Sequence, residues 1–208
     1  MDIAAIATRV PVIPVLTIDR VETAVPLAQA LVRGGLPVLE VTLRTETALQ
    51  ALERIAREVP DAVVGAGTVL DARQVEQVQR AGARFGVSPG CTTELAAAAR
   101  AAKLPFLPGV QTISEAMRLA DQGFSLLKFF PADTAGGIGW LKAASAPLGG
   151  LRFCPTGGIG AETAPAYLAL ANVVCVGGSW VAPRDAVADG DWGRVERLAA
   201  AASKLKRP

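Results

Sequence analysis

Short apolar segments alternate with amphipathic segments along the whole chain, and this alternation limits the folds open to it. Apolar runs of strand length occupy eight segments: 11–16, 37–43, 62–68, 85–89, 106–110, 125–131, 151–155 and 173–176. Helices are predicted over the segments 20–34, 46–58, 71–81, 92–102, 112–122, 138–145, 161–170 and 192–204. Apolar residues recur at helical spacing in the first two. Helix ends are indicated by Gly34–Gly35 as a C-cap, Asp71 as an N-cap and the capping-box pattern Thr112–Glu115. A short helix is predicted over 2–9, before the first strand. Strict alternation of strands and helices is typical of a parallel sheet, and eight units favour a closed (β/α)8 barrel over an open sheet.

The length of the chain fits one barrel of this kind. Its 208 residues allow about 26 for each of the eight units, so the loops must be short. Apolar residues make up 51% of the chain, which suits a parallel sheet that is covered on both faces. The composition does not shift along the chain. We therefore predict an α/β fold, a single TIM-barrel domain over residues 1–208 with a short N-terminal helix.

The charge and hydropathy patterns argue against membranes and nucleic acids as partners. Charged residues or glycines interrupt every apolar run before it reaches the roughly 20 residues that span a bilayer. The net charge is +2, only the tail Lys204–Arg207 is locally basic, and aromatic residues, at 5%, are few for base stacking. The first residues, Met1–Arg9, have no basic region ahead of a long apolar core and do not resemble a secretory signal. We expect a cytoplasmic protein that binds neither membranes nor nucleic acids.

Residue types that are scarce or missing exclude several classes of enzyme. The chain has no histidine, which removes the Ser-His-Asp triad, the Cys-His pair and histidine-ligated metals. Its three cysteines, Cys91, Cys154 and Cys175, are odd in number and far apart, which is neither a disulfide framework nor a zinc motif. An enzyme of this composition must move protons with carboxylates, lysine, tyrosine, hydroxyls or water. No metal site is predicted.

A lysine stands in the middle of the apolar strand Ser125–Pro131. Because side chains alternate along a strand, Leu126, Lys128 and Phe130 share one face of it. Burial lowers the pKa of a lysine, and a neutral amine attacks ketones to form a Schiff base. The alternative is a structural lysine near a strand end that extends to water. The strand by itself leaves both interpretations open.

The strand over 37–43 carries Glu40 and Thr42 on the face opposite its apolar residues, and Arg44 continues that face. In a barrel this face would point inward, where a glutamate is costly unless it is paired or takes part in chemistry. Glu40 and Arg44 are four residues apart, roughly 13 Å along a strand, so a direct ion pair would be strained. One alternative is a structural ion pair, which long side chains or a bound anion would have to bridge. The other alternative is that Glu40 is an acid/base deep in the barrel and that Arg44 binds a carboxylate near its mouth.

Glycines follow several predicted strands, at the edge where parallel barrels carry their active sites. They lie in the segments Gly65–Thr68, Ser88–Gly90, Gly157–Gly158 and Gly177–Ser179. Paired glycines after the last two strands expose backbone N–H groups, which form a recurrent phosphate site in such barrels. For each loop alone, a tight turn explains the glycines equally well. A lysine, a carboxylate, an arginine and a phosphate pocket on one rim suit Schiff-base chemistry on a phosphorylated oxo-acid.

Seven motifs, which occur in order over roughly residues 10–190, resemble one enzyme family. The motifs are Glu40–Thr45, Val64–Thr68, Ser88–Gly90, Leu107–Val110, Lys128–Ala132, Phe153–Ile159 and Gly177–Trp180. Together they look like the class I 2-keto-3-deoxy-6-phosphogluconate (KDPG) aldolases, which overlap with the 4-hydroxy-2-oxoglutarate (KHG) aldolases. The end of the first strand, Leu16–Ile18, is less diagnostic, and no role is predicted there.

The resemblance implies a homotrimer of (β/α)8 barrels that cleaves KDPG to pyruvate and glyceraldehyde 3-phosphate. It implies no cofactor beyond the covalent imine between the substrate and the enzyme. By the same resemblance, the catalytic residues are Lys128, which forms the Schiff base, and Glu40, the general acid/base. The substrate-binding residues are Arg44, Thr68, Pro89, Phe130 and Thr156, and the phosphate-binding residues are Gly157, Gly158, Gly178 and Ser179.

Other functions remain open on the sequence alone. The main substrate could instead be the galactonate epimer of KDPG, or the unphosphorylated KHG. A phosphate-binding barrel without catalytic activity, in which Lys128 is structural, is a second class. An isomerase of the phosphate-binding barrels is a third, which the absence of histidine and of an aspartate at a strand end disfavours.

Overall fold

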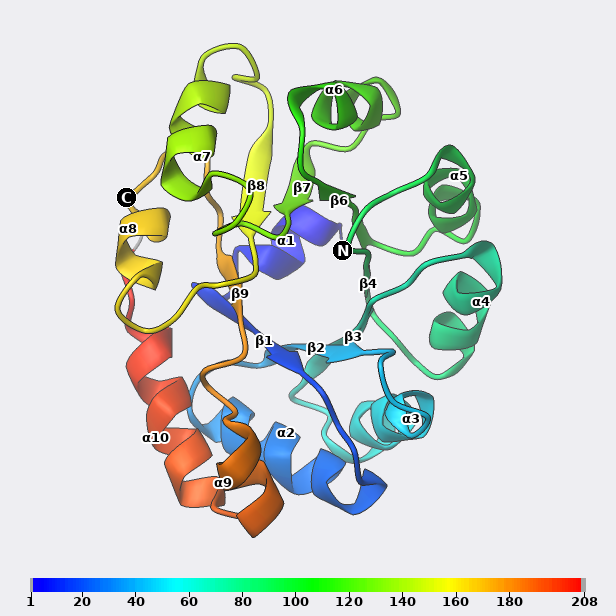
Figure 1. Ribbon diagram of the computed structural model, residues 1–208. Coiled ribbons are helices and arrows are strands. Elements are labelled where there is room, and N and C mark those ends of the chain that lie inside the picture. The colour runs from blue at the N-terminus through cyan, green and yellow to red at the C-terminus, as the bar shows by residue number, and fades with distance from the viewer. Residues whose placement is uncertain (1, 207–208) are drawn as a thin grey trace.

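The strands form a closed parallel barrel surrounded by helices (Figure 1). A computed structural model describes residues 2–206 of the chain. Within this part, the strands are Val12–Leu16 (β1), Val38–Thr42 (β2), Val63–Gly67 (β3), Gly86–Val87 (β4), Phe106–Leu107 (β5), Gly109–Val110 (β6), Leu126–Phe129 (β7), Arg152–Pro155 (β8) and Val176–Gly178 (β9). The predicted TIM barrel is confirmed.

The barrel closes through two hydrogen-bonded sheets and the bridges between them. One sheet has the order β5-β4-β3-β2-β1-β9 and the other β6-β7-β8, and the strand pairs are parallel. Isolated bridges from Phe153 to Val173 and from Thr156 to Gly177 join β8 to β9 and its approach. The strand predicted over 106–110 divides into β5 and β6 around Pro108, which has no N–H to donate to a neighbouring strand.

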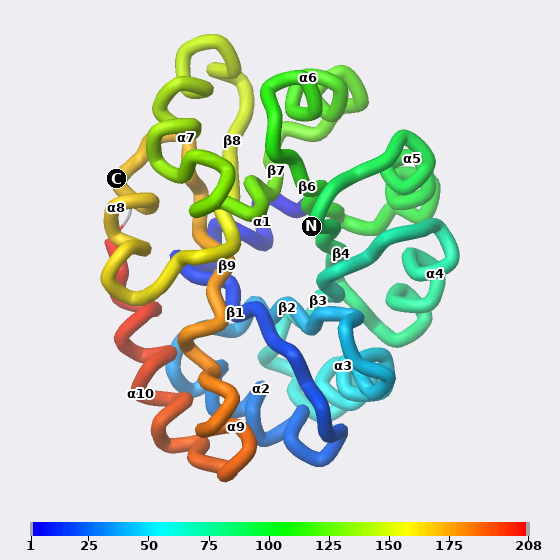
Figure 2. Tube along the Cα trace, viewed as in Figure 1, coloured from blue at the N-terminus to red at the C-terminus, as the bar shows by residue number. Residues whose placement is uncertain are grey.

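The helices surround the barrel and follow the predicted alternation. They are Ile3–Ala7 (α1), the 3-10 turn Val21–Thr23 (η1), Ala24–Arg33 (α2), Ala48–Glu58 (α3), Ala72–Arg80 (α4), Thr93–Ala101 (α5), Ile113–Asp121 (α6), Gly137–Ser145 (α7), Ala164–Leu168 (α8), Arg184–Asp189 (α9) and Trp192–Ser203 (α10). Helix α1 lies across one end of the barrel (Figure 2), where Ile6 and Ala7 are buried in the core. The predicted N-terminal helix therefore serves as a plug.

Local signals predicted several helix ends correctly. Asp71 accepts a hydrogen bond from the backbone N–H of Gln74 at 2.7 Å and so begins α4. Thr112 and Glu115 form the reciprocal capping box that begins α6. Gly34 ends α2 as its C-cap residue. These interactions are local in sequence, which is why the sequence predicts them.

Other elements also differ from the prediction, among them strand β4, which covers Gly86–Val87 instead of 85–89. Helix α8 covers five residues instead of 161–170, because Thr163 accepts a hydrogen bond from the N–H of Gly160 and makes a turn before the helix. Strand β9 begins at Val176 rather than at Val173, which takes part only in an isolated bridge. Helix α9 was not predicted; it lies between the last strand and the last helix.

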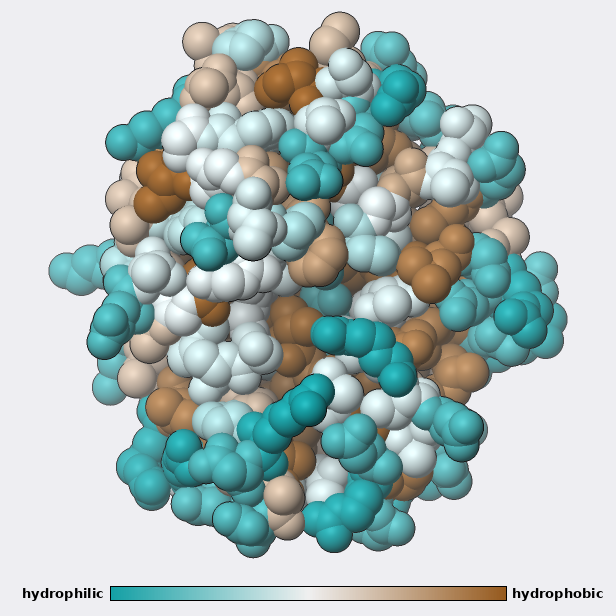
Figure 3. All heavy atoms as spheres, viewed as in Figure 1, coloured by the Kyte–Doolittle hydropathy of each residue, from teal (hydrophilic) through white to brown (hydrophobic). Residues whose placement is uncertain are grey.

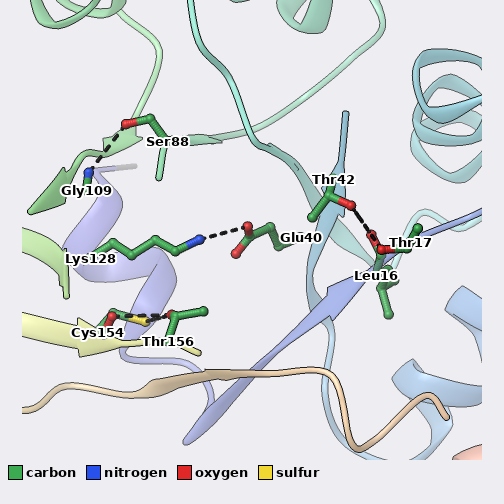
Figure 4. Close-up of polar contacts among 9 residues, drawn as sticks. All are labelled: Leu16, Thr17, Glu40, Thr42, Ser88, Gly109, Lys128, Cys154 and Thr156. Carbon is green, nitrogen blue, oxygen red and sulfur yellow. Dashed lines mark hydrogen bonds and ion pairs between the residues drawn. The ribbon is translucent and has the colours of Figure 1, made fainter. Parts of the chain in front are cut away.

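The two faces of β7 separate the core from the barrel interior as alternation predicts. Phe129 points outward and stacks on Trp140 of α7, with ring centroids 4.3 Å apart. Trp140 also meets Phe153 of β8 edge to face at 5.4 Å. Lys128, between the outward residues, points the other way, into the barrel (Figure 4). No helix among residues 2–206 is both long and apolar enough to cross a membrane.

The three cysteines are free thiols within the described chain, and Cys154 and Cys175 are buried. Cys91 is partly buried, and its Sγ donates to the carbonyl of Thr92 at 3.6 Å. Burial raises the pKa of the Cys91 thiol to about 11, although a hydrogen bond with Ser88 acts in the opposite direction. The reactive thiolate of Cys91 is therefore scarce at neutral pH.

We predict that iodoacetamide alkylates Cys91 at pH 8 roughly two orders of magnitude more slowly than it alkylates an exposed cysteine. A raised pKa means that the thiolate fraction rises about tenfold with each pH unit up to about 11. Peptide mass spectrometry of the native protein, labelled for short times between pH 7 and pH 9.5, measures the rate at each cysteine separately. A rate at Cys91 that levels off near pH 8.5 would contradict the prediction.

Candidate active site

A cavity of about 860 Å³ opens at the carboxyl ends of the strands. It forms the hollow near the centre of the face in Figure 3, where strongly hydrophilic side chains extend over it. The cavity brings together every residue that the sequence predicts for the site: Glu40, Arg44, Thr68, Pro89, Lys128, Phe130, Thr156, Gly157, Gly158, Gly178 and Ser179. Residues from six different strand ends thus meet in one place, as expected for a parallel barrel.

Lys128 and Glu40 point toward each other across the inside of the barrel (Figure 4). The Nζ of Lys128 on β7 lies 3.3 Å from Oε1 of Glu40 on β2. The side chains are only 6% and 3% exposed, so this is a buried ion pair. The alternative in which Lys128 extends to bulk water is therefore wrong. A buried amine next to a carboxylate is equipped for nucleophilic chemistry with local proton transfer.

The structure also shows that the alternative of a structural Glu40–Arg44 ion pair is wrong. Among the described residues, Glu40 pairs with Lys128, and Arg44 forms no ion pair. The two strand residues diverge because Glu40 lies deep in the barrel, whereas Arg44 follows the end of β2 at the cavity wall. Arg44 is thus available to a ligand with a negative charge.

Gly67 on β3 makes room for the Glu40 carboxylate. The two strands pair in parallel, with Thr42 opposite Gly67 and Glu40 opposite Gly65. A Cβ atom added at Gly67 would overlap the carboxylate of Glu40. The absence of a side chain at Gly67 therefore allows Glu40 to adopt the rotamer that reaches Lys128.

The wall of the cavity near Lys128 is shaped by Phe130 and by a constrained threonine. The Nζ of Lys128 lies 5.1 Å from the centroid of the Phe130 ring, within the range of a cation–π contact. Thr68 has φ of 59°, a left-handed conformation that is uncommon for a β-branched residue. Such strain concentrates at functional sites, where the surrounding structure holds it. Arg44, Thr68 and Pro89 line this part of the cavity.

The loops after β8 and β9 form the other end of the cavity. Gly157 and Gly158 have φ of 100° and 75°, which only glycine adopts readily. Among residues 2–206, neither of their N–H groups donates a hydrogen bond to the protein, so both remain available to a bound anion. Thr156 lies against Gly177, where a Cβ would overlap its hydroxyl. Glycine backbone thus lines this end of the cavity, with the Trp180 ring against Gly178 and the Asp133 side chain next to Gly158.

The cavity contains residues that the sequence analysis missed. Thr17, Asp19 and Arg20 follow β1, and Arg184 begins α9. The first three stand at a strand end, so the rule that points to the other sites could also have pointed to them. No sequence signal identified Arg184, because α9 itself was not predicted. Within the described chain, no group of three or more Cys, Asp or Glu side chains is placed to hold a metal ion.

The chain is similar over most of its length to known aldolases of one family. The family model for KDPG and KHG aldolases matches residues 3–198. The 2-dehydro-3-deoxy-phosphogluconate aldolase of Dickeya dadantii is 52% identical over 194 residues, which cover 93% of this chain and 91% of that protein.

Two solved structures are similar over nearly their whole length. The KDPG aldolase of Legionella pneumophila, with pyruvate captured as a covalent carbinolamine intermediate, has a TM-score of 0.96 and 46% identity, covering 98% of this chain and 99% of that one. The KDPG aldolase of Zymomonas mobilis with 3-phosphoglycerate has a TM-score of 0.94 and 48% identity, covering 99% and 97%. The chain therefore belongs to the KDPG and KHG aldolase family.

Proposed function

We propose that this protein is a Schiff-base aldolase that cleaves KDPG to pyruvate and glyceraldehyde 3-phosphate. The observation that carries the proposal is the buried Nζ of Lys128, 3.3 Å from Glu40 at the floor of a cavity that Arg44 and the loops after β8 and β9 also line. A buried amine beside a proton acceptor is the arrangement that imine formation requires. The covalent carbinolamine with pyruvate in the Legionella relative supports the same chemistry.

The reaction begins at Lys128. Glu40 accepts a proton from the lysine, and the free amine adds to the C2 ketone of the substrate. Glu40 returns that proton to the hydroxyl of the resulting carbinolamine, which leaves as water, so Glu40 is again a carboxylate. The protonated imine that remains is an electron sink. Glu40, through a water, takes the proton from the C4 hydroxyl, and the C3–C4 bond breaks. Its electron pair moves toward the imine, so glyceraldehyde 3-phosphate leaves and a pyruvate enamine remains. Protonation at C3 and hydrolysis release pyruvate and restore Lys128.

The other predicted residues hold the two ends of the substrate. Arg44, Thr68 and Pro89 bind the carboxylate next to the reacting ketone, and Phe130 packs beside Lys128. The phosphate lies at the opposite end, against the N–H groups of Gly157 and Gly158 in the loop after β8. Further contacts at that end come from Thr156, Gly157, Gly158, Gly178 and Ser179.

The family resemblance supports further expectations. We expect a cytoplasmic homotrimer whose partners are a phosphorylated sugar acid and pyruvate, with no cofactor beyond the imine on Lys128. Sedimentation velocity would test the trimer.

Cleavage of KHG is a second candidate activity, because the matching family model covers KHG aldolases as well. Relative rates on KDPG, its galacto epimer and KHG would rank the substrates.

We predict that incubation with pyruvate and borohydride gives a single reduced pyruvyl adduct on Lys128. The reason is that this amine lies buried at the cavity floor beside a proton acceptor. Intact-mass and peptide mass spectrometry would locate the adduct. Lys128→Ala should give none and lose nearly all turnover, whereas Lys142→Ala, at an exposed position of α7, should behave like the wild type. Adducts spread over surface lysines would refute the assignment.

Glu40→Gln should lower kcat for KDPG cleavage by about 10²- to 10⁴-fold, because proton transfer at the C4 hydroxyl loses its base. The pyruvyl adduct on Lys128 should form under borohydride more slowly than in the wild type, because the amine loses the neighbouring acceptor of its proton. Glu53→Gln, at an exposed position of α3, is the matched control and should retain full activity. If kcat of Glu40→Gln stayed within twofold of the wild type, Glu40 would not be the general base.

Gly67→Ala should lower kcat by at least about tenfold, because a Cβ at this position displaces the Glu40 carboxylate from Lys128. Thermal unfolding by circular dichroism separates this effect from global misfolding. Gly150→Ala is the matched control, since a Cβ there meets no atom within 4 Å. A folded Gly67→Ala variant with normal kcat would show that Glu40 does not depend on this space.

A further inference from the structure

The charged side chains that line the cavity include the cations that could neutralise the phosphate of the substrate. Among the described residues that line it, four are basic and two are acidic: Arg20, Arg44, Lys128 and Arg184, with Asp19 and Glu40. In the proposed function, Lys128 bonds to the ketone carbon and Arg44 binds the carboxylate. The glycine loops supply only uncharged N–H donors to a phosphate that carries close to two negative charges. Arg20 and Arg184 are therefore the remaining cations for that end of the substrate.

The strand order places Arg20 at the phosphate end. Strand β1 pairs with β9, with Ile13 opposite Gly177 and Pro14 opposite Gly178. The loop that follows β1 therefore emerges next to the loop that follows β9, which includes Ser179. Both loops line the same cavity, and Arg20 lies in the first of them. Arg44 follows the neighbouring strand β2 and lines the cavity with Thr68, at the carboxylate end.

Hydrogen bonds hold Arg20 in position over the mouth. Its Nη2 donates to the carbonyl oxygen of Ala188 in α9 at 3.0 Å, which joins the loop after β1 to α9. The hydroxyl of Thr23 donates to the carbonyl oxygen of Arg20 at 2.7 Å and anchors its backbone. One contact to Ala188 leaves other guanidinium N–H groups for a ligand, since arginine has five. The side chain of Arg184 has no hydrogen-bond partner within the described chain, so it is held less firmly.

We propose that Arg20 determines the preference of this enzyme for a phosphorylated substrate, with Arg184 in a lesser role. The proposal rests on the proposed function and adds a residue to it. A guanidinium matches two phosphate oxygens at once, and charge-assisted hydrogen bonds are about twice as strong as neutral ones. A sugar acid that ends in a hydroxyl gains little from Arg20. The glycine loops position the phosphate end of the substrate. Arg20 makes binding stronger when that end carries a negative charge.

The test compares Arg20→Gln with the wild type on two substrates, KDPG and its unphosphorylated counterpart 2-keto-3-deoxygluconate. We expect kcat/KM for KDPG to fall at least about 30-fold, mainly through KM, because ground-state and transition-state binding of the phosphate weaken together. The value for the unphosphorylated substrate should change less than about threefold. Arg20→Lys, which keeps the charge, should recover part of the loss. Arg197→Gln, on the exposed side of α10, is the matched control and should leave both values unchanged.

Several results would overturn the proposal. An unchanged preference in Arg20→Gln, or equal losses on both substrates, would remove the role of Arg20 in phosphate selection. A large loss in Arg184→Gln with a normal Arg20→Gln variant would transfer the role to Arg184. The pyruvate and borohydride adduct is measured in every variant as a check on the catalytic centre. Failure of the proposed function is distinct, because then the wild type itself would form no adduct and cleave no KDPG.

Discussion

The buried pair of Lys128 and Glu40 is the interaction on which the rest of the site depends. Removal of two charges from water costs several kcal/mol each, and a buried ion pair recovers that cost only with good geometry. Such a pair is weak support for stability, and replacement of one partner alone leaves an uncompensated buried charge. Its value here is chemical, since it keeps an amine and a proton acceptor together in a cavity. The pair also requires a closed barrel, because β2 and β7 face each other only when the sheet curls on itself.

Glycines on neighbouring strands determine where the functional side chains can lie. Gly67 leaves space for the Glu40 carboxylate, and Gly177 leaves space for Thr156. Gly177 is bridged to Thr156, and Gly67 lies two residues beyond Gly65, the residue opposite Glu40, on the same face of β3. In each case a large group on one strand lies against a position without a side chain on the next strand. The register of the strands thus controls the placement of the chemistry. This explains why glycines that resemble ordinary turn residues in the sequence act as positioning residues in the fold.

The two ends of the cavity differ in the groups that they present to a negative charge. One end has Arg44 beside the strained Thr68, and the other has unpaired backbone N–H groups with Arg20 at the mouth. A substrate with a carboxylate at one end and a phosphate at the other matches this arrangement. In the proposed function, the reacting bond lies between these two groups, over Lys128. The β1–β9 pairing that closes the barrel also brings Arg20 to the end of the cavity proposed for the phosphate, so one strand pairing serves both the closure of the fold and the proposed selection of substrate.

The sequence by itself determined the number of β-α units, the helix caps and the strand that carries Lys128, because periodicity and capping depend on neighbours along the chain. The seven motifs also predicted which residues would meet in the cavity. Only the tertiary structure decided that Glu40 pairs with Lys128, 88 positions away, rather than with Arg44. It also decided the short helix α9 and the place of Arg20, which follow from contacts between segments far apart in the chain. Local patterns contain no information on such contacts, since these form only when the barrel closes.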